Sequence, residues 1–303
     1  MEDYRKYLDP DTVSRLDNME LRARLVVEGF ITGLHKSPFH GFSVEFAEHR
    51  QYQPGDETKY IDWKIFGKTD KYFIKQFEEE TNLKSYILLD VSRSMDYGSE
   101  KRLKKIEYAS YIASSLAYLL IKQRDAVGLI TYDEDIKTYI PPHATKSYLK
   151  LILKELSNIT PKKKTFTSNS LDKIAEQIKR RGLIMIFSDL FDDPAKVLST
   201  LKHFRHNNHE VIVFQILDPM EMDFAFGKDA IFKDMESDEE MATQPFHLQK
   251  AYQNEMKKFL DFYQKECLMN QIDYVLLNTK MPFDVALMNF LRKRGKRIFL
   301  FST

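Results

Sequence analysis

The feature that most constrains the fold of this chain is an alternation of short apolar runs with amphipathic stretches, which begins at Ser85. Apolar runs at residues 86–89, 183–187 and 211–217 each stop abruptly at a polar or acidic residue. Between such runs, apolar residues recur three or four positions apart, as on one face of a helix. Short buried strands that alternate with helices are typical of a mostly parallel sheet with helices on both faces. We therefore predict a three-layer, Rossmann-like α/β fold.

The same pattern predicts where individual elements lie. Residues 126–132 and 136–140 are expected to pair as a hairpin, and Pro194 is expected to begin a helix. Gly182 is expected to end a helix at 170–181, in the left-handed conformation that glycine tolerates. The other expected elements are helices at 106–120, 147–157, 248–268 and 283–294, and strands at 274–277 and 297–301.

The first 80 residues follow a different pattern. A helix is predicted at 16–28, but residues 29–77 mix aromatic, glycine, proline and charged residues without a clear period. We expect a small accessory region at 1–80, containing a helix and short strands, and an α/β domain at 81–303. An acidic segment at about 222–245 interrupts the alternation and is interpreted as an inserted hairpin.

Composition limits the partners and the compartment of this 303-residue chain. The 46 Lys and Arg residues balance 45 Asp and Glu residues, so a net charge of +1 provides no general attraction to nucleic acid or anionic lipid. Cys267 is the only cysteine, which excludes an intrachain disulfide and a cysteine-based zinc cluster. No apolar run approaches the ~18 residues of a membrane span. We expect a soluble cytoplasmic protein with no nucleic-acid partner and no membrane insertion; composition leaves its oligomeric state open.

Candidate functional residues lie where the predicted strands end. Ligands of open α/β sheets bind beyond the carboxyl ends of the strands, near the point where strand order reverses. Asp90, Ser92 and Ser94 form a D-x-S-x-S motif at the end of a predicted strand. Alternate residues of a loop can point the same way, which would bring one carboxylate and two hydroxyls together. Such oxygen ligands suit Mg²⁺, which retains several of its waters and therefore needs few protein ligands.

A purely structural role for this motif is the alternative. Asp90 could cap the helix that follows, with the two serines forming a polar turn. Two further oxygen donors favour a metal site instead. Asp189 follows a second predicted strand, and Thr165 lies in a loop before the helix that leads into that strand.

These residues carry a resemblance to known families. Asp90, Ser92, Ser94, Thr165 and Asp189 resemble the metal-ion-dependent adhesion site of von Willebrand factor A domains. Segments upstream are similar to the signature of the bacterial "domain of unknown function 58" family, whose members join this signature to an A-like domain. The signature spans residues 41–63 and includes Gly41-Phe42-Ser43, Glu45-Phe46, Arg50-Gln51-Tyr52-Gln53-Pro54-Gly55-Asp56 and Ile61-Asp62-Trp63.

The resemblance implies binding rather than catalysis. In A domains the metal keeps one coordination position that a carboxylate of a partner fills, and the expected ion is Mg²⁺, with Mn²⁺ and Ca²⁺ as alternatives. The second metal loop departs from the family pattern, because residues 162–167 contain three lysines and no glycine. Thr165 is the expected ligand from this loop, and Thr167 is the alternative. The family also resembles proteins that work beside MoxR-type AAA+ ATPases, which implies an adaptor that presents client proteins to such an ATPase.

Two other functions compete with this interpretation. Asp90 could be the nucleophile of a metal-assisted phosphohydrolase. Phosphatases of that kind commonly have a second acid two residues later, but that position holds Ser92, which does not titrate near neutral pH. We therefore do not expect an enzyme. The other alternative is a scaffold protein in which the metal site is vestigial and empty.

Three remaining patterns are given structural interpretations. Gly67-Lys68-Thr69 imitates the end of a phosphate-binding loop, but the required earlier glycine is replaced by Asp62. His203, His206 and His209 are interpreted as a solvated helix end rather than a metal site. The basic segment 101–105 is expected to form the solvated face of a helix.

Overall fold

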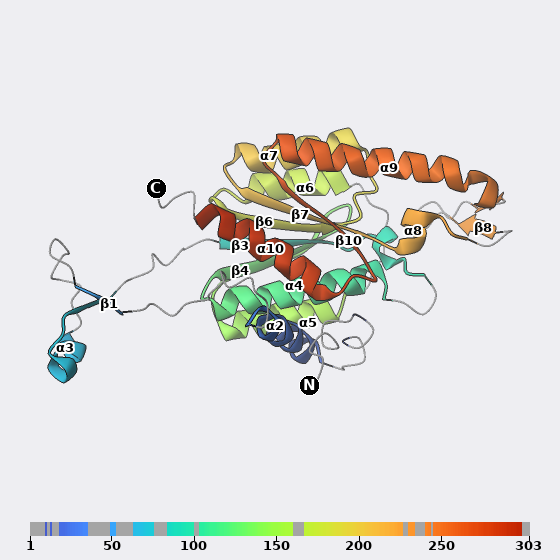
Figure 1. Ribbon diagram of the computed structural model, residues 1–303. Coiled ribbons are helices and arrows are strands. Elements are labelled where there is room, and N and C mark those ends of the chain that lie inside the picture. The colour runs from blue at the N-terminus through green and yellow to red at the C-terminus, as the bar shows by residue number, and fades with distance from the viewer. Residues whose placement is uncertain are drawn as a thin grey trace. The chain divides into compact units, whose positions relative to one another are not determined.

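A computed structural model of the chain describes residues 10, 13, 18–35, 49–52, 63–75, 84–99, 103–159, 167–226, 230–233, 240–243 and 245–298 (Figure 1). The chain forms two compact units. One consists of Met1–Lys36 together with Leu83–Thr303, and the other of Ser37–Asn82. This division differs from the expected boundary at residue 80, because the N-terminal helix belongs to the larger unit.

The larger unit is built on a six-stranded sheet with the order β10-β7-β6-β3-β4-β5. Neighbouring strands are parallel except for β5, which runs antiparallel to β4 at one edge. The strands are β3 (Lys84–Asp90), β4 (Ala126–Tyr132), β5 (Ile136–His143), β6 (Gly182–Ser188), β7 (Glu210–Leu217) and β10 (Asp273–Asn278). The chain moves from β3 through β4 to β5 and then returns to β6 on the other side of β3, which is the strand order of a doubly wound sheet.

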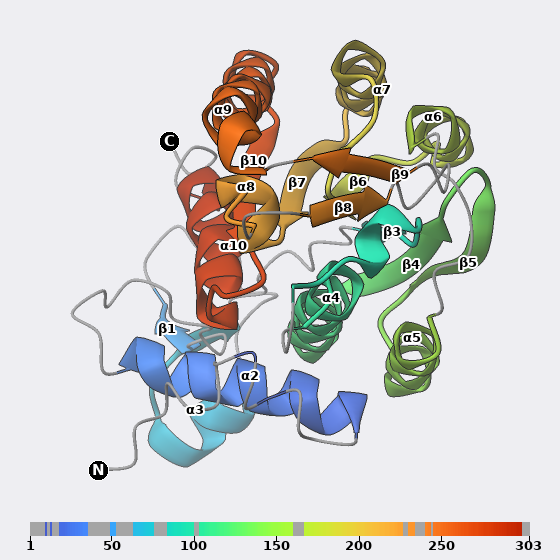
Figure 2. The same cartoon turned by 90° about the vertical axis from the view of Figure 1, so that its right-hand side faces the viewer.

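Helices cover both faces of this sheet, as the view along it shows (Figure 2). Helices α4 (Lys105–Lys122), α5 (Lys146–Ser157) and α10 (Phe283–Ile298) lie on one side, and α6 (Thr167–Gln177), α7 (Pro194–His206) and α9 (Pro245–Met269) lie on the other. The expected three-layer α/β fold is therefore confirmed. Within the described residues, no helix is both long and apolar enough to cross a membrane.

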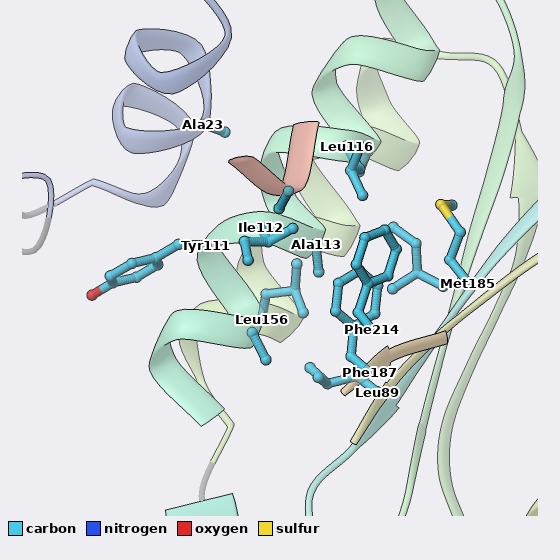
Figure 3. Close-up of a cluster of buried hydrophobic side chains, with 14 of the residues drawn as sticks. Ala23, Leu89, Tyr111, Ile112, Ala113, Leu116, Leu156, Met185, Phe187 and Phe214 are labelled. Atoms are coloured by element: carbon cyan, nitrogen blue, oxygen red, sulfur yellow. The ribbon is translucent and has the colours of Figure 1, made fainter. Parts of the chain in front are cut away.

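The two faces of the sheet bury separate apolar clusters, since side chains alternate along each strand. Ile87 and Leu89 of β3 face α4, whereas Leu88 belongs to the cluster beneath α6, α7 and α9. On the α4 side, Phe187 and Phe214 stack with ring centroids 4.7 Å apart. Figure 3 shows the side chains of this cluster between the sheet and α4.

Helix α2 (Met19–His35) adds a further layer outside α4. Asn18 caps its first turn, because its Oδ1 accepts a hydrogen bond from the Glu20 amide at 2.8 Å. Ala23, Val26 and Val27 are fully buried in the same apolar cluster as α4. The N-terminal helix is therefore part of the core of the sheet unit.

Short elements connect the larger ones. A 3₁₀ helix η3 (Ser94–Asp96) follows β3, and α8 (Pro219–Asp223) follows β7. Strands β8 (Ala230–Lys233) and β9 (Glu240–Thr243) pair antiparallel, which confirms the hairpin expected within 222–245. The expected hairpin of β4 with β5 and the helix beginning at Pro194 are confirmed as well.

The smaller unit contains an antiparallel pair, β1 (His49–Gln51) with β2 (Phe73–Lys75), and helix α3 (Trp63–Thr69). Phe66 of α3 stacks on Tyr72 with ring centroids 4.5 Å apart. Gly67-Lys68-Thr69 forms the end of α3 rather than a loop around a phosphate. Most of the signature at 41–63 lies outside the described residues.

Two local expectations are wrong. Helix α10 continues to Ile298, so a strand does not begin at Arg297; residues 299–301 lie outside the described part of the chain. Helix α6 ends at Gln177, and Gly182 instead begins β6 without a left-handed backbone. Glycine is needed there for a different reason, because a Cβ would lie 2.3 Å from the carbonyl oxygen of Lys84 on the neighbouring strand.

Substitution of Gly182 by alanine should therefore destabilise the sheet. The obstructing atom belongs to the backbone of a paired strand and cannot move aside, so we expect Gly182→Ala to lower the free energy of unfolding by about 1–3 kcal/mol. Chemical denaturation measures the change. Gly67→Ala is the control, because nothing lies within 4 Å of its Cβ position. Equal stability of Gly182→Ala and wild type would contradict the close approach.

The assignment of α2 to the core of the sheet unit gives a second prediction. Val26→Asp places a charge in the apolar cluster and should lower the free energy of unfolding by several kcal/mol, on the order of 3 or more. Leu21→Asp is the matched control, because this residue of the same helix is 43% exposed. Similar unfolding midpoints for the two variants would show that α2 is not part of the cooperative unit.

Candidate functional site

The candidate site lies where the strand order reverses, at the carboxyl ends of β3 and β6. These strands are parallel neighbours whose pairing runs to Leu89 opposite Phe187. Asp90 ends β3 and Asp189 directly follows β6, so parallel pairing brings the two predicted acids to the same edge of the sheet. Both side chains are buried, with Asp90 1% and Asp189 2% exposed.

Asp90 is held by groups from both strands. Its Oδ1 accepts a hydrogen bond from the Ser92 amide at 2.9 Å, and its Oδ2 accepts one from Ser188 Oγ at 2.7 Å. Ser188 Oγ also accepts the amide of Leu190 at 3.0 Å. Ser188 was not predicted, and it links the first loop of the site to the loop that carries Asp189.

The two serines of the D-x-S-x-S motif converge as expected from their alternate positions. Ser92 is fully buried, and its Oγ lies 3.0 Å from Ser94 Oγ at the start of η3. The carboxylate of Asp90 and both hydroxyls therefore lie within one short loop. The expected third loop cannot be compared, since Thr165 lies outside the described residues and the side chain of Thr167 is not described.

Electrostatics at this edge disfavour an ionised Asp90. Burial raises the pKa of Asp90 to about 7, and the negative charge of Asp189 adds to this rise. The hydrogen bonds from Ser92 and Ser188 favour the ionised form and partly offset it. A divalent cation would reverse this balance, because it favours the ionised form of a nearby carboxylate.

Tyr132 supplies another buried oxygen at this edge. It ends β4 and is fully buried. Burial raises the pKa of Tyr132 well above its usual value, and the charges of Asp90 and Asp189 contribute to the rise. Ser188, which also donates to Asp90, opposes this rise through a hydrogen bond.

Asp189 has a charged partner, Lys105. Asp189 Oδ2 accepts a hydrogen bond from Lys105 Nζ at 2.8 Å, and Asp189 Oδ1 accepts one from the Phe191 amide at 3.1 Å. The backbone of the same loop is held from β7, where Gln215 Nε2 donates to the carbonyl of Asp189 at 2.8 Å. Hydrogen bonds to both carboxylate oxygens and to the carbonyl oxygen therefore fix the position of Asp189.

Lys105 is the main residue that sequence reasoning missed. It begins α4 and was expected on a solvated face, but it is fully buried. Its Nζ contacts Glu221 Oε1 at 2.6 Å as well as Asp189, and it lies 4.9 Å from the ring centroid of Phe191. Burial alone would lower the pKa of Lys105, but the two carboxylates outweigh it and raise the pKa above its usual value.

Glu221 is positioned by a capping box at the start of α8. Its Oε2 accepts a hydrogen bond from the Asp218 amide at 2.8 Å, and Asp218 Oδ1 accepts one from the Met220 amide at 2.8 Å. Asp218 Oδ2 also accepts bonds from the amide and hydroxyl of Ser99, both at 3.0 Å. The D-x-x-E spacing of Asp218 and Glu221 was the available sequence signal for this helix start.

The residues present fit a hard cation in part. The carboxylate and hydroxyls of Asp90, Ser92 and Ser94 form an oxygen donor set of the kind that Mg²⁺ prefers. Asp189 fits less well as a direct ligand, because its Oδ2 already pairs with an ammonium. Among the described residues, no group of three or more His, Cys, Asp or Glu side chains is placed to hold a metal ion, so a cation here would depend on the serine hydroxyls.

The three histidines of the 203–209 segment do not form a metal site. His209 was expected at a solvated helix end, but it is fully buried. Its Nδ1 accepts the amide of Gly182 at 3.2 Å, and its Nε2 lies 3.0 Å from the carbonyl oxygen of Ile178. His209 thus satisfies backbone groups between α6 and β6, and its burial lowers its pKa.

The doubly wound sheet and the strand-end motif define a von Willebrand factor A-like α/β domain. A family model described as "Protein of unknown function DUF58" matches residues 48–258, which is more than half of the chain. The chain therefore belongs to this family.

Two mycobacterial proteins have similar sequences. Uncharacterized protein Rv1480 of Mycobacterium tuberculosis and uncharacterized protein Mb1516 of Mycobacterium bovis are each 24% identical over 235 residues, covering 76% of this chain and 72% of theirs.

Two solved structures are similar to this chain over part of its length. BatB from Bacteroides thetaiotaomicron is 16% identical and covers 71% of this chain and 99% of its own, with a TM-score of 0.45. The SpRpn10 VWA domain is 10% identical and covers 69% of this chain and 94% of its own, with a TM-score of 0.41.

The raised pKa of Asp90 predicts a pH-dependent gain in stability for Asp90→Asn in EDTA. Between the ordinary carboxyl pKa and about 7, the folded chain binds a proton at Asp90 that the unfolded chain releases. Stability from this group is therefore lost as pH rises through that window. At pH 8 the neutral amide should raise the free energy of unfolding by on the order of 1–4 kcal/mol.

Denaturant unfolding at pH 4 to 8 measures this gain, which should shrink toward pH 4. Asp223→Asn is the control, because it removes the same charge at an exposed position of α8. A loss of stability at pH 8, or a gain that is equal at every pH, would contradict the prediction.

Proposed function

We propose that this protein is a cytoplasmic interaction module that binds a carboxylate of a partner protein through a divalent cation. The observation that carries the proposal is the convergence of Asp90, Ser92 and Ser94 at the point where strand order reverses, with the two hydroxyls 3.0 Å apart. The ion is Mg²⁺, with Mn²⁺ and Ca²⁺ as alternatives. When bound, it supplies a strong local positive charge that attracts an incoming carboxylate.

The chain's own residues would orient this ion. Ser188 Oγ and the Ser92 amide hold the Asp90 carboxylate, while the hydroxyls of Ser92 and Ser94 offer neutral donors. Neutral donors leave more of the positive charge on a cation than carboxylates do, which favours capture of an external acid. Thr165 is proposed as a further ligand on the resemblance to A domains, and Thr167 is its alternative.

The partner is proposed to be a MoxR-type AAA+ ATPase and its client protein. This assignment follows from the resemblance of the family to proteins that work beside such ATPases. A binding role is favoured over phosphoryl transfer because Ser92 stands where a phosphatase would place its second acid. Ser92 is also fully buried and hydrogen-bonded within the loop.

Thermal unfolding in EDTA, Mg²⁺, Mn²⁺ and Ca²⁺ tests the metal site. We expect at least one ion to stabilise the wild type, by ~2.7 kcal/mol at a concentration of 100 Kd, because a ligand of the native state adds its binding free energy. Asp90→Ala and Ser92→Ala should lose this gain, and Asp223→Ala should retain it. No stabilisation by any ion would favour a scaffold with an empty site.

Partner capture tests the interaction. A tagged wild-type chain should retain the purified MoxR-type ATPase of the same organism in Mg²⁺ but not in EDTA, and Asp90→Ala should not retain it. Metal-independent retention would contradict the proposed mode of binding. Turnover of a phosphate ester that disappears in Asp90→Asn would instead establish a phosphohydrolase.

A further inference from the structure

The buried ammonium of Lys105 already pairs with Asp189, one of the proposed metal ligands. Lys105 Nζ lies 2.8 Å from Asp189 Oδ2 and 2.6 Å from Glu221 Oε1, and the lysine side chain is fully buried. Neither the von Willebrand factor A resemblance nor the pattern of the sequence assigns a role to this lysine. Its position bears directly on how many acids can ligate a divalent ion.

The ammonium is fixed in its place by the groups around it. The Tyr97 and Phe191 rings lie within 5.9 Å and 4.9 Å of Nζ, so the charge is enclosed by aromatic rings as well as by two carboxylates. Glu221 is itself fastened to the Asp218 amide. Removing one member of a buried ion pair leaves uncompensated charge in a low-dielectric interior, which strongly opposes displacement of Lys105.

The charge of Asp189 is therefore balanced before any divalent ion binds. The hydrogen bonds that Asp90 accepts from the Ser92 amide and Ser188 Oγ come from neutral donors. Asp189 is neutralised by Lys105. A divalent ion bound directly to Asp189 would lie within a few ångströms of the ammonium, and like charges at that separation repel strongly outside bulk water.

We propose that Lys105 stays paired with Asp189 when a divalent ion binds. The ion is then ligated directly by Asp90, Ser92 and Ser94 but not by Asp189. With one acidic ligand instead of two, the ion keeps more of its charge for a carboxylate of the partner. This consequence for partner binding rests on the proposed function. Lys105 is thus a positioning residue that sets the charge of the site.

Calorimetric titration of the full chain with Mn²⁺ alone tests the inference. In Lys105→Met, the carboxylate of Asp189 loses its ammonium partner and can join Asp90, so we expect Mn²⁺ to bind at least about tenfold more tightly than to wild type. Asp90→Asn should abolish binding.

The double variant Lys105→Met with Asp189→Asn is the matched control. It removes one positive and one negative charge together, so the net charge of the site is unchanged. We expect its Mn²⁺ affinity to stay within about threefold of wild type, because the deleted pair is neutral. This variant also keeps the test valid if Lys105→Met alone fails to fold.

The outcomes separate this inference from the proposed function. Loss of Mn²⁺ binding in the double variant, as complete as in Asp90→Asn, would make Asp189 a direct ligand and overturn the inference while leaving the proposed function intact. Failure of folded Lys105→Met to bind more tightly than wild type would also overturn it. Asp90-dependent binding by Lys105→Met but not by wild type would support the inference and overturn the proposed function. Absence of binding to both would overturn both.

Discussion

The buried contact of Lys105 with Asp189 and Glu221 joins three parts of the sheet unit that are far apart in sequence. It ties the start of α4 to the end of β6 and to α8 beyond β7. Burying these charges costs desolvation free energy, which their mutual attraction offsets only when the geometry is good. The surrounding hydrogen bonds supply that geometry, because Gln215 holds the Asp189 loop and the Asp218 amide holds Glu221. The carboxyl edge of the sheet therefore depends on this one ammonium.

The sheet itself determines where this edge becomes a site. Because strand order reverses between β3 and β6, the loops after these strands diverge to opposite faces, and Asp90 and Asp189 lie where the two loops part. Two apolar clusters, one on each face, hold the strands rigidly below the site. Helix α2 extends one of these clusters, so the N-terminal segment contributes to the stability of the domain that carries the candidate metal ligands.

Local patterns predicted most of the sheet unit. The apolar runs predicted β3, β4, β6 and β7 because strands buried on both faces are mostly apolar, and Pro194 predicted the start of α7. Errors arose where a neighbouring segment decides the outcome. Gly182 is required by the carbonyl of Lys84 rather than by a helix end, and α10 continues through Arg297 although the apolar residues after it resemble a strand. No sequence window contains these contacts.

The sequence by itself determined the α/β class, the placement of Asp90 and Asp189 at strand ends, and the spacing that aligns Ser92 with Ser94. These follow from periodicity and from the direction of parallel strands, which are local properties. Only the tertiary structure decided that Lys105 is buried, that Ser188 bonds Asp90, and that Asp189 already pairs with a cation. Burial of a lysine depends on partners more than 80 residues away in sequence, and no local pattern distinguishes it from a lysine on a solvated helix face.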